Sequence, residues 1–96
     1  MEEQKLKPEH DHFLGTPEGF AEYLSEVFKS RDSTQVTEAT AAAVCWHGIS
    51  DIARAAHLTR VSTYRDYAAG GEPSLKSFLA VLDALGVELQ AIPKSQ

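Results

Sequence analysis

The sequence predicts an all-α fold, built as a single domain of five helices. Apolar residues recur at intervals of three and four along several segments, which is the period of a helix with one buried face. Ser or Thr stands directly before these segments and Gly follows most of them, as expected of helix starts and ends. A chain of 96 residues can bury roughly 60–65% of its unfolded surface, which is enough for one core.

The first helix is expected from Pro17 to about Ser30. Thr16 fits the N-cap, and proline is favoured at the first helical position. Apolar residues at i, i+3, i+4, i+7 and i+8 then form one stripe: Phe20, Tyr23, Leu24, Val27 and Phe28. We expect this stripe to lie mainly in the core, and any surplus to pack on a second copy or on a partner.

The second helix, rich in alanine, is expected over about 34–47. Ser33 fits its N-cap and Gly48 its C-terminal stop. Cys45 lies in an apolar Ala-Ala-Val-Cys-Trp run, so we expect a buried and unreactive thiol. It is the single cysteine of the chain, which excludes an internal disulfide framework.

Three shorter helices complete the prediction. They cover about 51–56, 60–68 and the stretch from Leu75 to Leu85, and their expected N-caps are Ser50, Thr59 and Ser74. The last of these helices is expected to bury an apolar stripe in the core: Leu75, Phe78, Leu79, Leu82 and Leu85. The Gly-Gly pair at 70–71 would end the fourth helix and Gly86 the fifth. Residues 87–92 alternate apolar and polar, which indicates a short C-terminal strand or an extended tail.

The third and fourth helices, joined by a tight turn, have the pattern of a helix-turn-helix. In that motif the second helix enters the major groove of DNA. The charge is distributed unevenly between the two halves of the chain, which suggests that the halves have different functions. Residues 1–48 hold four Lys/Arg against nine Asp/Glu, whereas residues 49–96 hold five of each. An acidic half repels phosphate and attracts basic proteins, so the two halves are expected to bind different partners.

The stretch 49–86 resembles the helix-turn-helix antitoxins of the HigA-like, XRE-related type, a group also called addiction-module antidote proteins. Five motifs carry the resemblance: Asp51-Ile52-Ala53-Arg54; Leu58-Thr59-Arg60; Ser62, Tyr64 and Arg65; Gly70-Gly71-Glu72-Pro73-Ser74-Leu75; and residues 79–87. The resemblance implies a lambda-repressor-like fold. It also implies a type II antitoxin that represses its own operon as a homodimer and neutralises a RelE- or HigB-like ribonuclease toxin.

Several positions depart from the pattern of this group. His57 stands where the turn usually has glycine, although histidine tolerates the left-handed conformation better than most residues. Asp51 replaces a residue that is commonly Gln and would lie near a phosphate. Thr63 and Asp66 occupy positions that are usually apolar and face the core.

Side chains at the start of the fourth helix are the candidate DNA contacts. Arg60 and Arg65 are long enough for bidentate contacts with guanine, and Val61 could touch a thymine methyl group. Other cationic and hydroxyl groups would hold the phosphate backbone, which positions the protein without specifying sequence. These are Arg54, Thr59, Ser62, Ser74 and Lys76. With so few cations per chain, useful affinity is expected to need two copies on a palindrome.

A row of carboxylates, four residues apart, marks the first helix as a candidate toxin surface: Glu18, Glu22 and Glu26. Such a row is ordinarily a solvated face, and here it could also attract a basic toxin. The chain thereby divides into an acidic arm (1–15), a helical region for toxin or dimer contacts (16–48) and the DNA-binding region (49–96).

Two other functions fit the same residues. One is a stand-alone transcriptional repressor, of phage or host type, without a toxin. The other is a protein-interaction module that has lost DNA binding, which Asp51, Asp66 and the net charge of −5 favour.

Catalysis, metals and membranes have little support in the sequence. No nucleophile is paired with a base, and no glycine-rich phosphate loop or cofactor motif occurs. His10 and His12 lie two apart in the polar arm and are not expected to bind a metal, nor are Cys45 and His47, which a helix would point to different sides. Without a leader or a bilayer-spanning run of ~18 apolar residues, we expect a soluble cytoplasmic protein without a membrane partner.

Overall fold

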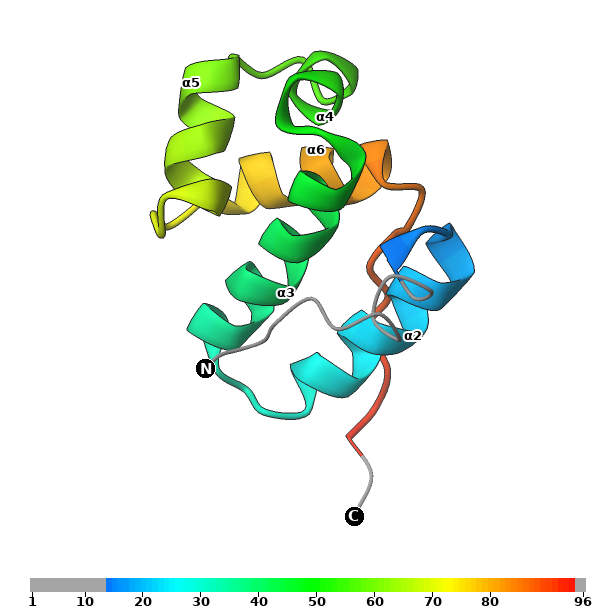
Figure 1. Cartoon of the computed structure of the whole chain (residues 1–96). Coiled ribbons are helices and arrows are strands. Elements are labelled where there is room, and N and C mark those ends of the chain that lie inside the picture. Colours follow the sequence, from blue (N-terminus) through cyan, green and yellow to red (C-terminus); the bar gives the residue numbers. More distant parts are fainter. Residues whose placement is uncertain (1–13, 95–96) are drawn as a thin grey trace, which may run out of the picture.

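Helices account for all the regular secondary structure in the computed structural model, which describes residues 14–94 (Figure 1). The elements are α2 (Pro17–Phe28), α3 (Ser33–His47), α4 (Ile49–Ala55), α5 (Arg60–Thr63), the π-helical turn η1 (Tyr64–Ala68) and α6 (Leu75–Ala84). α5 passes directly into η1, so the two form the predicted fourth helix and are called the 60–68 helix below. The predicted all-α fold is confirmed.

α3 is the central element of the fold. It contacts α2, α4 and η1, while α4 also contacts α5 and α6. In Figure 1, α2 lies at one end of the molecule, α4 and α5 lie at the other, and α3 runs between them. The helix-turn-helix is therefore held away from α2 by the length of α3.

The core is assembled from both ends of the chain. Its most buried side chains include Phe20 and Leu24 from α2, Val44 from α3, and Val81 and Leu82 from α6, none more than 3% exposed. The apolar stripe of the first helix thus lies in the core as predicted. Only its last member, Phe28, is 37% exposed.

Three of the predicted N-caps are confirmed by hydrogen bonds. The side-chain oxygens of Thr16, Thr59 and Ser74 each accept the backbone N–H three residues on, at 3.0 Å. Each bond satisfies one of the donors that a helix start leaves without a partner.

Two predicted caps are wrong. α3 is capped by Asp32, whose carboxylate accepts the Thr34 N–H at 2.9 Å, so Ser33 becomes the first helical residue. α4 begins at Ile49, directly after Gly48, and Ser50 lies inside the helix without a capping bond. A single glycine with φ 106° therefore ends one helix and begins the next.

The expected C-terminal strand is not formed among the described residues. Residues 87–94 contain no strand, and no backbone–backbone hydrogen bond joins residues 88–94 to another described residue. A strand needs a partner to satisfy its backbone, and the rest of the described chain is helical. Leu89 and Ile92 are accordingly 43% and 76% exposed.

The expected burial of Cys45 is also wrong, because its side chain is exposed. Ala43 and Val44 point into the core, and the next residue of a helix is turned by about 100° away from its neighbour. Neighbouring atoms still desolvate the thiol and raise its pKa above the ordinary value.

The predicted acidic arm, residues 1–15, lies almost wholly outside the described residues, as do His10 and His12. Its Leu14 is described and belongs to the core, at 1% exposed. The Leu14 carbonyl oxygen lies 3.1 Å from His47 Nε2, which ties this residue to the end of α3. None of the described helices has the length and apolar character needed to cross a membrane.

Candidate nucleic-acid interface

The turn between α4 and the 60–68 helix depends on a left-handed residue. His57 has φ 60°, as expected for a residue standing at the usual glycine position. The turn is closed by a backbone hydrogen bond of 2.8 Å from Leu58 N–H to the Ala53 carbonyl. Histidine therefore supports the helix-turn-helix geometry here, and the departure from the family pattern leaves the motif intact.

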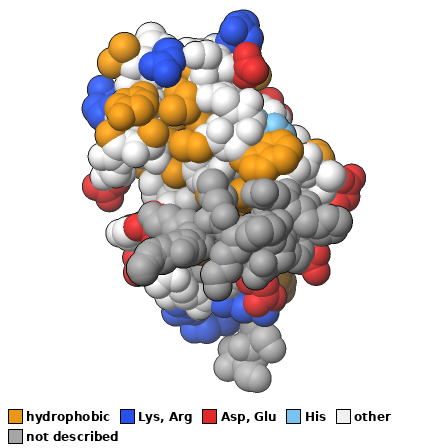
Figure 2. All heavy atoms as spheres, in the orientation of Figure 1, with side chains coloured by type: hydrophobic (Ala, Val, Ile, Leu, Met, Phe, Trp, Pro, Cys, Tyr) orange, Lys and Arg blue, Asp and Glu red, His pale blue; other side chains and the backbone are white. Residues whose placement is uncertain are grey.

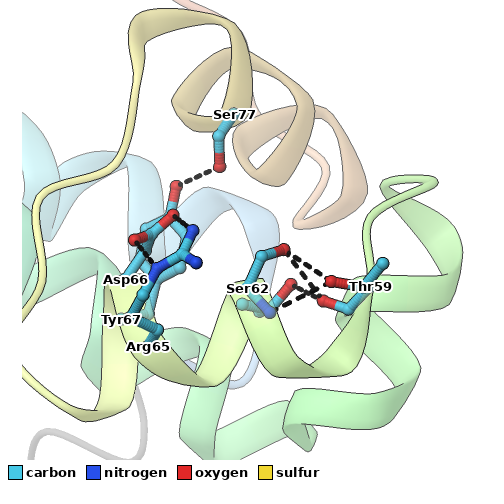
Figure 3. A network of polar contacts seen from close by, with 7 residues as sticks. Thr59, Ser62, Arg65, Asp66, Tyr67 and Ser77 are labelled. Carbon is cyan, nitrogen blue, oxygen red and sulfur yellow. Dashed lines mark hydrogen bonds and ion pairs between the residues drawn. The ribbon is translucent and has the colours of Figure 1, made fainter.

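Hydroxyl groups fix the start of the 60–68 helix (Figure 3). Thr59 Oγ1 accepts the Ser62 N–H at 3.0 Å and donates to Ser62 Oγ at 2.9 Å. Ser62 Oγ lies in turn 3.2 Å from the Thr59 carbonyl oxygen. Both side chains are thus engaged with each other, which holds the helix start in one orientation.

The solvent-facing side of this helix carries both apolar and cationic groups. Val61 and Tyr64 are 75% and 49% exposed, and the Arg65 side chain is 65% exposed. Figure 2 shows Lys and Arg side chains beside hydrophobic ones over α4 and α5. Tyr64 was not among the predicted site residues, although its spacing of three from Val61 places it on the same face.

Arg60 is oriented by the preceding helix. Its Nε donates to Ser50 Oγ in α4 at 2.9 Å. No ion pair joins Arg60 to a carboxylate among residues 14–94. No described carboxylate therefore offsets the charge of this exposed guanidinium.

Arg65 is instead paired with the adjacent Asp66 (Figure 3). Its Nε and Nη2 donate to the two carboxylate oxygens at 3.1 and 3.4 Å. This hydrogen bond and the attraction of the carboxylate raise the pKa of Arg65 above its ordinary value. The Asp66 side chain is only 14% exposed, so the expectation that this position faces inward is largely confirmed.

Arg54 has a similar neighbour at the other side of the motif. Its Nη1 lies 3.1 Å from Asp51 Oδ1, and both side chains are more than 70% exposed, at 75% and 71%. An exposed ion pair of this kind contributes little to stability. It does offset a cation at the position where a phosphate contact was predicted.

Two polar side chains anchor the 60–68 helix to the core. Thr63 is 1% exposed, and its hydroxyl donates to the Thr59 carbonyl at 2.8 Å. Tyr67 is 3% exposed, and its hydroxyl lies 3.2 Å from Ser77 Oγ in α6. Both hydroxyls are therefore satisfied, and the second bond joins this helix to α6.

The remaining predicted site residues are exposed but lie on other elements. Ser74 and Lys76 are at the start of α6, where the Ser74 hydroxyl is occupied as the N-cap. Glu18, Glu22 and Glu26 lie on α2, at the opposite end of the molecule from α5 (Figure 1). Glu26 pairs with Lys29 at 3.0 Å. Within residues 14–94, no three His, Cys, Asp or Glu side chains come together as potential metal ligands.

A protein-family model described as "Probable addiction module antidote protein" matches residues 6–93. The chain belongs to this family. The match covers nearly the whole sequence, which supports an antitoxin with a toxin as its partner. Comparisons with curated proteins and with solved structures give no significant match. The narrower HigA-like and XRE-related assignment remains a prediction.

The buried Tyr67 phenol should make stability depend on pH in the alkaline range. Burial is the main cause that raises its pKa above the usual ~10. Because the pKa is raised in the folded state, the stability that the protonated phenol contributes is complete below the pKa of this group in the unfolded chain. It is lost as the pH rises through the pKa of the group in the folded chain. The urea midpoint of the wild-type chain should therefore fall with rising pH between roughly pH 9 and 11, the range around the ordinary tyrosine pKa. The midpoint of Tyr67→Phe should fall less steeply over the same range.

The exposed Tyr64 provides the matched control for this measurement. Tyr64→Phe should follow the wild-type curve. Tyr64 is 49% exposed, so this substitution removes no buried phenol. Tyr67→Phe should also cost about 0.5–1.5 kcal/mol at neutral pH through the lost hydrogen bond to Ser77. Parallel alkaline curves for Tyr67→Phe and the wild type would contradict the assignment.

Proposed function

We propose that this antitoxin binds operator DNA as a homodimer, represses its own operon and neutralises a RelE- or HigB-like ribonuclease toxin. The observation that carries the DNA-binding part is the 60–68 helix. It follows a left-handed turn at His57, is anchored inward by Thr63 and Tyr67, and exposes Val61 and Tyr64 at 75% and 49%. An outward helix on a rigid support is the element that a helix-turn-helix inserts into the major groove.

Base recognition is assigned to Arg60, Val61 and Arg65. Arg60 is the strongest candidate, since it is exposed, free of a described carboxylate and directed by Ser50. Val61 offers an apolar contact for a thymine methyl group. Arg65 must leave Asp66, or share it, before it contacts guanine, so its contribution is smaller than that of Arg60.

Phosphate contacts are assigned to the residues around this face: Arg54, Thr59, Ser62, Ser74 and Lys76. The hydroxyl pair of Thr59 and Ser62 holds the helix start, where backbone N–H groups without intrahelical partners attract a phosphate. Lys76 is an exposed cation at the start of α6. These contacts would set the register of the protein on DNA rather than its sequence preference.

The number of free cations argues for binding as a dimer. Arg54 and Arg65 are each paired with an aspartate, which leaves Arg60 and Lys76 as cations near the helix-turn-helix without a described ion pair. Each phosphate contact contributes roughly one released counterion to the affinity. Two copies on a palindrome double this small number.

Toxin binding is assigned to the exposed carboxylates of α2: Glu18, Glu22 and Glu26. They lie on α2, at the opposite end of the molecule from α4 and α5 in Figure 1, so a basic partner could bind there without covering the DNA-binding face. A row of like charges steers an oppositely charged protein and raises its association rate.

One alternative keeps support from specific contacts. The pairs Arg54–Asp51 and Arg65–Asp66 favour an interaction module that has lost DNA binding. A gel shift on DNA from upstream of its own gene, at two salt concentrations, separates the functions. Specific binding that weakens with salt rejects the module, and absence of binding at low salt rejects the repressor.

Removing both arginines of the 60–68 helix should strongly weaken operator binding. Each base contact contributes about 1–3 kcal/mol of discrimination, so Arg60→Ala with Arg65→Ala should weaken specific binding at least ~30-fold. Lys94→Ala is the control, because Lys94 is an exposed cation of the C-terminal segment, outside the proposed DNA-binding face. Gel shifts with circular dichroism measure both affinity and helicity. Unchanged affinity in the double variant would overturn the assignment of this site.

Removing the carboxylate of Asp66 should have the opposite effect. Asp66→Asn frees Arg65 and deletes a negative charge beside the proposed DNA backbone, so affinity should rise roughly 3- to 10-fold and the salt dependence should steepen. Asp83→Asn removes an exposed carboxylate from α6 and serves as the control. A loss of affinity in Asp66→Asn would show that this carboxylate positions Arg65 productively.

Neutralising the α2 carboxylates should weaken toxin capture. Deleting α2 is not a clean test, because Phe20 and Leu24 belong to the core. Instead, Glu18→Gln, Glu22→Gln and Glu26→Gln together should reduce toxin binding about 10-fold while operator binding persists.

Three other exposed carboxylates provide a variant of equal charge: Glu38→Gln, Glu72→Gln and Glu88→Gln. Titration calorimetry with the purified cognate toxin compares the two triple variants. An equal loss of toxin binding in both would contradict a specific acidic face, because it would reflect net charge alone.

A further inference from the structure

An apolar groove lies where the start of α6 meets the turn between α2 and α3. It encloses about 410 Å³, and its apolar walls are formed by Phe28, Val36, Leu75 and Phe78. The core stripe predicted for α6 is wrong at Leu75 and Leu79, which lie one turn apart and are 70% and 45% exposed. A helix that leaves two leucines in water beside an open apolar groove has a face that another surface is expected to cover.

We propose that this groove is the twofold interface of the homodimer, with Leu75 of each copy seated in the groove of the other. This inference rests on the proposed dimeric function and deepens it by naming the surface. A twofold contact is isologous, so one patch must supply both the protruding and the receiving part. Here the protruding Leu75 and the receiving Phe28 and Phe78 belong to the same patch.

The charges at the groove also suit a second copy. Its rim carries Arg31 and Asp32, adjacent residues of opposite sign. A twofold axis can set each of these side chains near its opposite from the other copy, and the patch as a whole carries no net repulsion. The uniformly acidic row on α2 lacks this property, because two copies meeting there would bring carboxylates together.

The position of the groove relative to the 60–68 helix supports the same partner. Figure 1 shows the start of α6 beside the end of this helix, and the Tyr67–Ser77 hydrogen bond of 3.2 Å joins the two. Two copies that bind one face of DNA must hold these helices about 34 Å apart. A contact at the start of α6 places the interface next to this helix in each copy.

Consecutive residues at the start of α6 can therefore serve two partners. Ser74 caps the helix and Lys76 is an exposed cation, while Leu75 lies between them in sequence. Side chains of neighbouring helical residues point about 100° apart. Leu75 can thus face the second copy while Lys76 reaches a phosphate, which would couple dimerisation to DNA binding.

The proposal is tested by measuring the oligomeric state of the full chain without DNA. Analytical ultracentrifugation over a range of concentrations gives this state. The wild-type chain should sediment at twice its mass of 10.5 kDa. Leu75→Glu should raise the dimer dissociation constant at least ~30-fold, as expected of a central interface residue, with unchanged helicity by circular dichroism. Leu79→Glu should act in the same direction.

Two exposed apolar residues elsewhere provide matched controls. Ile92→Glu and Val61→Glu alter side chains that are 76% and 75% exposed, and both variants should remain dimeric. A monomeric wild-type chain, a dimeric Leu75→Glu, or dissociation by Ile92→Glu instead would each overturn the proposed interface. A dimer that fails to bind operator DNA would leave the interface standing and overturn only the proposed DNA-binding function.

Discussion

The anchoring of the 60–68 helix is the constraint on which the proposed site depends. Thr63 and Tyr67 turn one side of this helix into the core at 1% and 3% exposure, and both hydroxyls are hydrogen-bonded. Because the inner side is fixed in this way, the outer side has a defined set of exposed residues. The tyrosine bond to Ser77 extends the constraint to α6, whose start forms one wall of the groove described above. A loosely packed helix could carry the same side chains without holding them in a geometry that DNA could match.

Two of the three arginines in and before the 60–68 helix are paired with aspartates. Asp51 and Asp66 each take up an arginine that would otherwise be free for phosphate or guanine, and Arg60 stays without such a partner among the described residues. Pairing weakens non-specific attraction to DNA, because fewer counterions are released when the protein binds. Contacts with the bases then account for a larger share of the affinity, and one well-placed guanidinium has a large effect on them. With a net charge of −5, the proposed operator binding is therefore expected to rely on two copies acting together.

Much of this arrangement was predictable from the sequence, and the exceptions share a cause. The caps at Thr16, Thr59 and Ser74 are local features, since a side chain bonds a backbone group three residues on, and all three are confirmed. The burial of Cys45 was predicted from its apolar neighbours, whereas the phase of α3 about its axis decides exposure. The strand over 87–92 has the right alternation, but pairing depends on a partner that the described chain does not supply. Local sequence therefore gave three of the five predicted caps, and Asp32 and Gly48 stand at the starts where Ser33 and Ser50 were expected. Burial and pairing depended on contacts between distant segments.

The core also determines how far the two proposed activities can be separated. α2 carries the acidic face, and it supplies Phe20 and Leu24 to the same core that holds Val81 and Leu82 of α6. A toxin that displaces α2 on binding would therefore change the packing of α3, which contacts both α2 and η1. Coupling between two binding sites requires an element whose arrangement both sites can bias, and α3 is the described helix that touches both. Because the acidic face and the 60–68 helix share one core, the proposed toxin binding and operator binding are expected to be thermodynamically linked.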